Sequence, residues 1–74
     1  MPYVNIKVTG GSEAPTAEQK AELIRGVTDL LQRVLNKNAA TTVVVIDEVA
    51  MDNWGIGGES ITVRRQKAKA QKPA

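Results

Sequence analysis

The feature that most constrains the fold is one long amphipathic helix pattern between two strand patterns, in a chain of only 74 residues. Thr16 and Gln19 have the spacing of a capping box, which predicts that a helix begins after Thr16 and continues to about Leu35 or Lys37. Apolar residues recur at the three- and four-residue spacing of one helix face. They are Leu23, Ile24, Val27, Leu30, Leu31, Val34 and Leu35.

Segments with strand character lie on both sides of this helix. From Pro2 to Val8 the chain alternates apolar and polar side chains, and from Thr41 to Ile46 it is β-branched throughout. A strand, a helix and a strand of these lengths form a βαβ unit with parallel strands. We therefore predict an α/β fold, namely a small βαβ unit followed by a C-terminal β-hairpin.

The second strand also predicts oligomerisation. Four consecutive apolar residues, Val43 to Ile46, place apolar side chains on both faces of the sheet. The one predicted helix covers one face only, and an exposed β-branched face would invite aggregation. We expect the sheet to be completed by further copies of the chain, since a domain this small is marginally stable alone.

The C-terminal part is expected to contain a tight hairpin from Trp54 to Glu59 and a short strand from Ile61 to Arg65. Residues 1–65 would form the domain, and residues 66–74 a disordered basic tail with three lysines. The formal net charge of +2 has its origin in that tail. With few aromatic residues and no basic folded face, we expect no nucleic-acid partner.

Composition excludes much chemistry. The chain has no His and no Cys, so we expect no disulfide, no metal site, no cofactor and no histidine-based triad. The glycine run ends in Glu59 rather than Lys-Ser/Thr, which argues against a phosphate loop. Asp47 and Glu48 are adjacent on a strand and should point to opposite faces, so they are not expected to share a catalytic site.

No apolar segment suits a targeting signal or a membrane span, so a cytoplasmic location is expected.

Pro2 is the candidate catalytic residue. Removal of Met1 would leave a secondary amine, and an ordinary α-amine has a pKa of about 7.7–8.0 that desolvation lowers. Such a group can act as a base near neutral pH. The alternative is purely structural, because proline is common at the start of an edge strand.

The combination of motifs resembles the 4-oxalocrotonate tautomerase family over roughly residues 2–65. It rests on Pro2 opening the first strand and on these segments: Gln19-Lys20, Leu23-Ile24-Arg25, Asp47-Glu48, Trp54-Gly55-Ile56-Gly57-Gly58-Glu59 and Val63-Arg64-Arg65. The resemblance implies that Met1 is removed and that Pro2 is the general base that moves a proton on a small enol or α-keto acid. It also implies a homo-oligomer, usually a hexamer.

Trp54 stands where the family usually has the Phe of the apolar pocket wall, and Ile56 would line the same wall. Family members hold substrate with two arginines that this chain lacks, one before the helix and one at the position of Val43. Arg64 could supply the positive charge, with Arg65 or Lys7 as alternatives. The missing arginines leave open dehalogenase- or decarboxylase-type chemistry of the superfamily, or an oligomer without catalytic activity.

Overall fold

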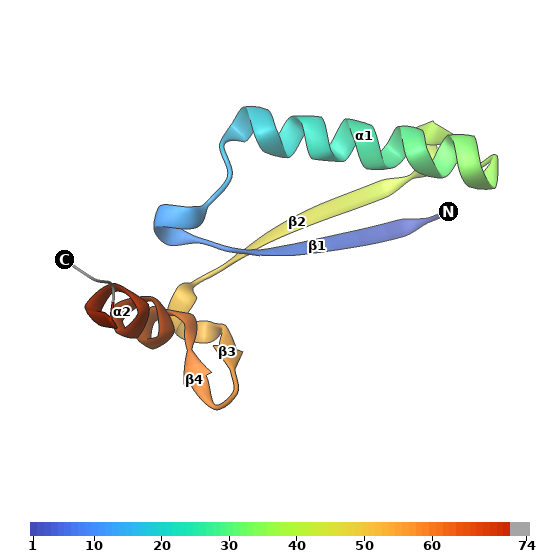
Figure 1. Cartoon of the computed structure of the whole chain (residues 1–74). Helices are drawn as coiled ribbons and strands as arrows, with labels where there is room; N and C mark the ends of the chain where they lie inside the picture. Colours follow the sequence, from blue (N-terminus) through green and yellow to red (C-terminus); the bar gives the residue numbers. More distant parts are fainter. Residues whose placement is uncertain (72–74) are drawn as a thin grey trace.

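A computed structural model describes residues 1–71 of the chain. It contains a strand–helix–strand unit, then a short hairpin and a second helix (Figure 1). The elements are β1 (Tyr3–Thr9), α1 (Ala17–Leu35), β2 (Val43–Val49), β3 (Gly55–Ile56), β4 (Glu59–Ser60) and α2 (Ile61–Gln71). Short 3-10 turns precede α1, β2 and β3. The predicted α/β class with a βαβ unit and a C-terminal hairpin is confirmed.

Strands β1 and β2 form a two-stranded parallel sheet, with Tyr3 opposite Val43 and Thr9 opposite Val49. Helix α1 runs along one face of this sheet (Figure 1). Side chains alternate along a strand, so Asn5 and Lys7 lie on the other face, which no helix of residues 1–71 covers. The parallel pairing predicted from the sequence is therefore confirmed.

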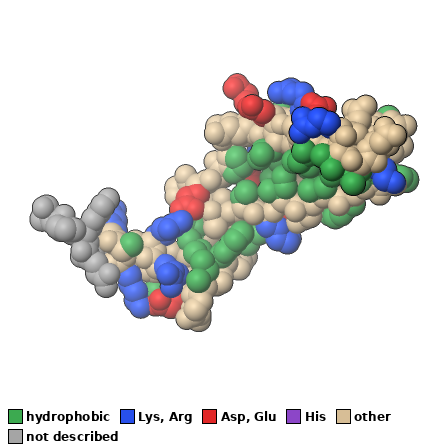
Figure 2. All heavy atoms as spheres, turned by 45° about the vertical axis from the view of Figure 1, so that its right-hand side comes forward, with side chains coloured by type: hydrophobic (Ala, Val, Ile, Leu, Met, Phe, Trp, Pro, Cys, Tyr) green, Lys and Arg blue, Asp and Glu red, His purple; other side chains and the backbone are tan. Residues whose placement is uncertain are grey.

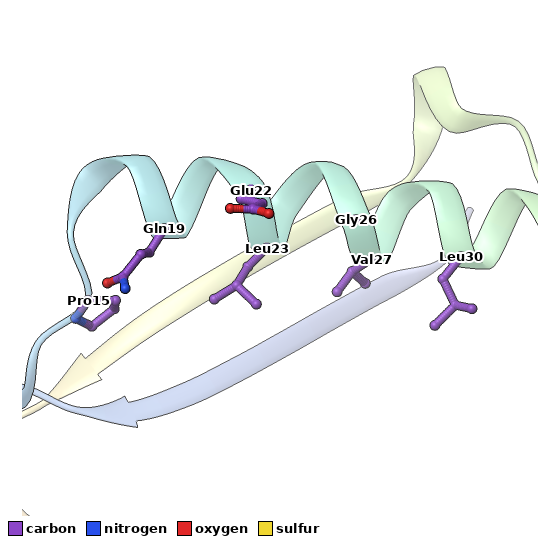
Figure 3. Close-up of a pocket in the computed structure, with 7 residues that line it drawn as sticks. All are labelled: Pro15, Gln19, Glu22, Leu23, Gly26, Val27 and Leu30. Atoms are coloured by element: carbon purple, nitrogen blue, oxygen red, sulfur yellow. The ribbon is translucent and has the colours of Figure 1, made fainter.

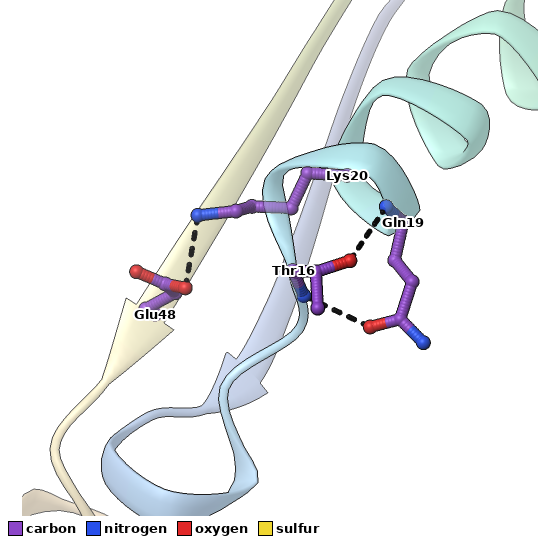
Figure 4. Close-up of polar contacts among 4 residues, drawn as sticks. All are labelled: Thr16, Gln19, Lys20 and Glu48. Atoms are coloured by element: carbon purple, nitrogen blue, oxygen red, sulfur yellow. Dashed lines mark hydrogen bonds and ion pairs between the residues drawn. The ribbon is translucent and has the colours of Figure 1, made fainter.

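The ends of α1 follow from local hydrogen bonding. The Gln19 amide donates to Thr16 Oγ1 at 3.1 Å, and the Thr16 amide donates to Gln19 Oε1 at 2.9 Å (Figure 4). These two bonds confirm the predicted capping box. The helix ends where Asn36 adopts a left-handed conformation with φ of 54°, which asparagine tolerates better than most residues.

Helix α2 corrects two predictions. Residues 61–65 are helical and not a strand, and the helix continues to Gln71, into the segment that was expected to be disordered. The remainder of that predicted tail, residues 72–74, lies outside the described part of the chain. The Val63 amide donates to Ser60 Oγ at 3.3 Å, so Ser60 caps the new helix. Lys67 also reaches back to Glu59 in an ion pair.

A residue in the first turn anchors this second helix. Ile61 is 5% exposed, and its amide donates to the carbonyl of Trp54 at 2.8 Å. The sequence of Ile61-Thr62-Val63 has β-propensity, but the following Arg, Gln, Lys and Ala residues favour a helix. The cap at Ser60 and these helix formers outweigh the β-branched residues.

The single protomer has almost no hydrophobic core. Ile61 is the only buried apolar residue within residues 1–69, for which side-chain burial is described, and Leu23, Leu30 and Val43 are about two-fifths exposed (39%, 45% and 42%). The radius of gyration is 16.5 Å, whereas a compact chain of this length has about 11 Å. Figure 2 shows apolar side chains gathered on an open face of the molecule. Association with further chains would cover this surface.

Neither helix within residues 1–71 is long and apolar enough to cross a lipid bilayer.

We predict that Thr16→Ala lowers the free energy of unfolding by about 1 kcal/mol, because the Gln19 amide loses its acceptor. Thr16→Ser keeps a hydroxyl and should stay close to the native value. Urea unfolding followed by circular dichroism tests this, at one fixed protein concentration because assembly contributes to stability. Equal stability of the two variants would show that the cap is not needed.

Candidate active site

Pro2 lies at the N-terminal end of the sheet and is held there by the backbone. Its carbonyl oxygen accepts a hydrogen bond from the Val43 amide at 3.0 Å. Pro2 is half-buried, whereas the preceding Met1 is exposed. Tyr3 and Val43 lie side by side in the strand register. The parallel sheet thus fixes the residue whose nitrogen Met1 removal would free, and it places valine beside it.

Trp54 and Ile56 lie at the other end of β2, on the β3–β4 hairpin (Figure 1). Ile56 pairs with Glu59, and the turn between them is made by Gly57 and Gly58, with φ of 60° and 89°. Two successive positive φ values are easy for glycine, which explains the glycine pair. Trp54 borders a hollow of about 300 Å³ lined also by Lys7, Val49, Asn53 and Gly55.

One chain does not bring these predicted site residues together. Pro2 is beside Val43 at the start of β2, whereas Trp54 follows the end of that strand. A strand of this length spans about 20 Å at 3.3 Å per residue. A pocket that contains both Pro2 and Trp54 therefore requires more than one protomer.

The structure distinguishes among the three cations considered for substrate binding. Lys7 Nζ lies 3.0 Å from a carboxylate oxygen of Asp47, and Arg65 Nε lies 2.8 Å from one of Glu13. Glu13 raises the pKa of Arg65 chiefly through this hydrogen bond. Among residues 1–69, Arg64 takes part in no ion pair. Arg64 is thus the one of the three without a direct ion pair, although its charge, after that of Lys67, also helps to lower the pKa of Glu59.

Arg64 lies beside the glycine turn of the hairpin. A Cβ added at Gly57 would be 3.9 Å from Arg64 Nη1. Arg64 also lines a shallow hollow of about 240 Å³ with Glu59, Lys67 and Ala68. The hairpin and the first turn of α2 thus carry Trp54, Ile56 and Arg64 as one structural unit.

The adjacent carboxylates Asp47 and Glu48 point to opposite faces, as predicted. Asp47 accepts from Asn5 Nδ2 at 2.8 Å and from Lys7 Nζ at 3.0 Å on the open face. Glu48 accepts from Lys20 Nζ at 3.0 Å on the face that α1 covers (Figure 4). They form two separate ion pairs and not a paired-carboxylate site.

A hollow larger than those beside Trp54 and Arg64 lies along α1, and the sequence patterns did not predict it. It has a volume of about 640 Å³ and opens beside the helix (Figure 3). Its lining residues are Pro15, Gln19, Glu22, Leu23, Gly26, Val27 and Leu30. The only sequence signal was the glycine in mid-helix. With a single carboxylate and an apolar lining, the groove resembles a contact surface more than a catalytic pocket.

Comparison with known proteins identifies the class. A family model described as tautomerase enzyme matches residues 2–64. A probable tautomerase from Dickeya dadantii is 65% identical over 68 residues, covering 92% of this chain and 98% of the relative. A 2-hydroxymuconate tautomerase from Bacillus subtilis is 31% identical, covering 84% and 95%.

A solved structure agrees with these relatives. The crystal structure of DmpI from Helicobacter pylori superimposes with a TM-score of 0.79 at 54% identity, covering 88% of this chain and 97% of that protein. The chain belongs to the tautomerase family. The resemblance deduced from the Pro2 strand and the glycine hairpin is therefore confirmed.

The contacts of Asp47 predict its titration. The hydrogen bond from Asn5, followed by the contact with Lys7, lowers the pKa of Asp47. The stabilisation is therefore fully present above the ordinary aspartate pKa of about 3.9 and is lost as pH falls through the lower pKa of the folded state. NMR titration of Asp47 should give a midpoint below about 3.9, raised by Asn5→Ala and by Lys7→Met. A midpoint unaffected by both substitutions would contradict these contacts.

Proposed function

We propose that this protein is a tautomerase that moves a proton on a small enol or α-keto acid, with Pro2 as the general base after removal of Met1. The observation that carries the proposal is the backbone bond between Pro2 and Val43, which holds the proline at the end of the sheet in a tautomerase-family chain. The absence of His and Cys leaves few other groups that can act as a base near pH 7.

Removal of Met1 converts the Pro2 nitrogen from an amide into a secondary amine. An ordinary α-amine has a pKa of about 7.7–8.0, and an apolar pocket wall lowers it by penalising the charged form. The neutral amine takes the proton of an enol hydroxyl, the carbonyl forms, and the same proton is returned to a carbon of the substrate. The reaction is an isomerisation that needs no cofactor.

The proposed pocket is shared between protomers. Pro2 of one chain would face Trp54 and Ile56 of another, because the two ends of the sheet are too far apart within one chain. The exposed apolar surface of the protomer supports a homo-oligomer. A 4-oxalocrotonate tautomerase from Chloroflexus aurantiacus, 29% identical with a TM-score of 0.73, is described as a heterohexamer. We propose a homohexamer for this chain, in the cytoplasm and without nucleic-acid or membrane partners.

Arg64 is the proposed contact for the substrate carboxylate. It is free of ion pairs within the described side chains, and it is carried by the same hairpin unit as Trp54. Valine at position 43 cannot bind a carboxylate. These features favour a substrate held by one arginine over a dicarboxylate held by two.

The first test compares ketonisation of phenylenolpyruvate and of 2-hydroxymuconate by the native protein and by Pro2→Ala. Loss of the positioned base should lower kcat about 10²-fold, at the low end of general-base effects because the substituted alanine keeps a primary amine. Intact mass should show that both proteins lack Met1. Equal rates with both substrates would contradict the role of Pro2.

The same assay separates the rival functions. Val43 in place of an arginine is also compatible with the alternative of an oligomer without catalytic activity. In that case the processed native protein ketonises neither substrate although it assembles normally. Dehalogenase- or decarboxylase-type chemistry would instead show as release of halide from a halogenated acid or of carbon dioxide from a keto acid.

The second test compares Arg64→Gln with Arg65→Gln. Loss of a charge-assisted contact should raise KM for the acid substrate about 10- to 100-fold in Arg64→Gln with a smaller change in kcat. Arg65→Gln removes the same charge from the adjacent residue, whose partner is Glu13, and should leave KM near the native value. A rise in KM for Arg65→Gln alone would assign the contact to Arg65 instead.

A further inference from the structure

The single tyrosine of the chain directly follows Pro2 and is exposed. Tyr3 is 64% exposed, and its partner in the strand register, Val43, is 42% exposed. Paired residues of neighbouring strands place their side chains on the same face of a sheet. For Tyr3 and Val43 this is the face that no helix of residues 1–71 covers (Figure 1). They form a small apolar surface with one polar atom, the phenolic oxygen, at the end of the sheet where Pro2 lies.

The threonine hydroxyls at this end of the sheet are already used within the chain. Thr41 and Thr42 both donate to the carbonyl of Asn38, at 3.2 and 3.0 Å. The side-chain hydrogen bonds among residues 1–69 do not include the Tyr3 hydroxyl. Tyr3 therefore offers a donor to a ligand, whereas the valine beside it offers none.

Tyr3 is also the exception among the polar side chains on its face of β1. The others each donate to a carboxylate within the chain, at distances of 2.8, 3.0 and 2.6 Å. They are Asn5, Lys7 and Thr9. An exposed donor that lacks such a partner, next to the proposed base, points to a partner outside the chain.

We propose that Tyr3 is a second catalytic residue, whose hydroxyl donates a hydrogen bond to the enol oxygen of the substrate that Pro2 deprotonates. The inference rests on the proposed function, since it adds a donor to the same site. Consecutive Cα atoms are only about 3.8 Å apart, and the bond between the Pro2 carbonyl and the Val43 amide fixes both residues at one edge of the sheet. The Pro2 nitrogen continues the line of the strand and the Tyr3 ring projects from its face, so a small acid at the end of the strand can contact both.

The hydroxyl of Tyr3 would act where charge develops during the reaction. As the Pro2 amine takes the proton of the enol hydroxyl, negative charge grows on the enol oxygen. A donor positioned at that oxygen stabilises the charge, most strongly where water is excluded. The carbonyl then forms and a substrate carbon takes the proton from the Pro2 ammonium, so Tyr3 keeps its own proton throughout. The substrate carboxylate remains the proposed partner of Arg64.

Tyr3→Phe tests this role because it removes one oxygen atom and keeps the ring. In the ketonisation of phenylenolpyruvate, kcat should fall about 10²-fold with little change in KM, as for the loss of one oxyanion donor. Thr42→Val is the matched control, since it removes a hydroxyl at the same end that is bonded within the chain, and its kcat should stay near the native value. A native kcat in Tyr3→Phe, or equal losses in the two variants, overturns the proposal.

Binding of phenylglyoxylate gives a measurement that does not need turnover, because this α-keto acid has no hydrogen next to its carbonyl and cannot enolise. Calorimetry should show about 5- to 10-fold weaker binding to Tyr3→Phe than to the native protein. Phenylacetate, which lacks the keto oxygen, should bind both equally. Equal binding of phenylglyoxylate, or none to the native protein, overturns the contact. If this difference is found in a protein that ketonises neither enol, the Tyr3 contact stands and the role of Pro2 fails.

Subunit exchange tests whether Tyr3 and Pro2 of one chain act together. In an equal mixture of Tyr3→Phe and Pro2→Ala, no chain carries both native residues, so activity should stay at the average of the two variants. Recovery to about a quarter of the native value would show that Tyr3 serves the site of a neighbouring chain, which overturns the contact within one chain.

Discussion

The parallel pairing of β1 and β2 is the constraint on which the rest of the structure depends. A parallel pair cannot be closed by a tight turn, so the chain must cross over through α1 on one face of the sheet. Both strands then start at the same edge, with Pro2 bonded to Val43 there. The chain leaves β2 at the far edge, and this is where the hairpin with Trp54 must lie.

The same pairing explains why a single copy is incomplete. A two-stranded sheet with one helix leaves the face with Asn5 and Lys7 open, and α1 itself keeps a groove around Gly26. Among the described apolar side chains, only that of Ile61 is buried, at the junction of the hairpin and α2. Burial of the remaining apolar surface and formation of the proposed pocket would then come from the same event, the association of protomers.

Sequence patterns predicted the parts of the structure that local physics determines. The capping box at Thr16, the β-branched second strand and the glycine turn at Gly57 each specify an element through neighbouring residues. The strand predicted from Ile61 to Arg65 was wrong, because β-propensity over a few residues gave way to the cap at Ser60 and to helix formers further along the chain. Only the structure could show that Lys7 and Arg65 are already paired, since their partners are distant in the sequence.

The most direct test of a site shared between protomers mixes two impaired variants, Pro2→Ala and Trp54→Ala, and allows their subunits to exchange. If Pro2 of one chain works with Trp54 of another, mixed oligomers contain some sites with both native residues, and activity should recover to about a quarter of the native value in an equal mixture. Mixtures that show only the average of the two separate variants would contradict the shared site.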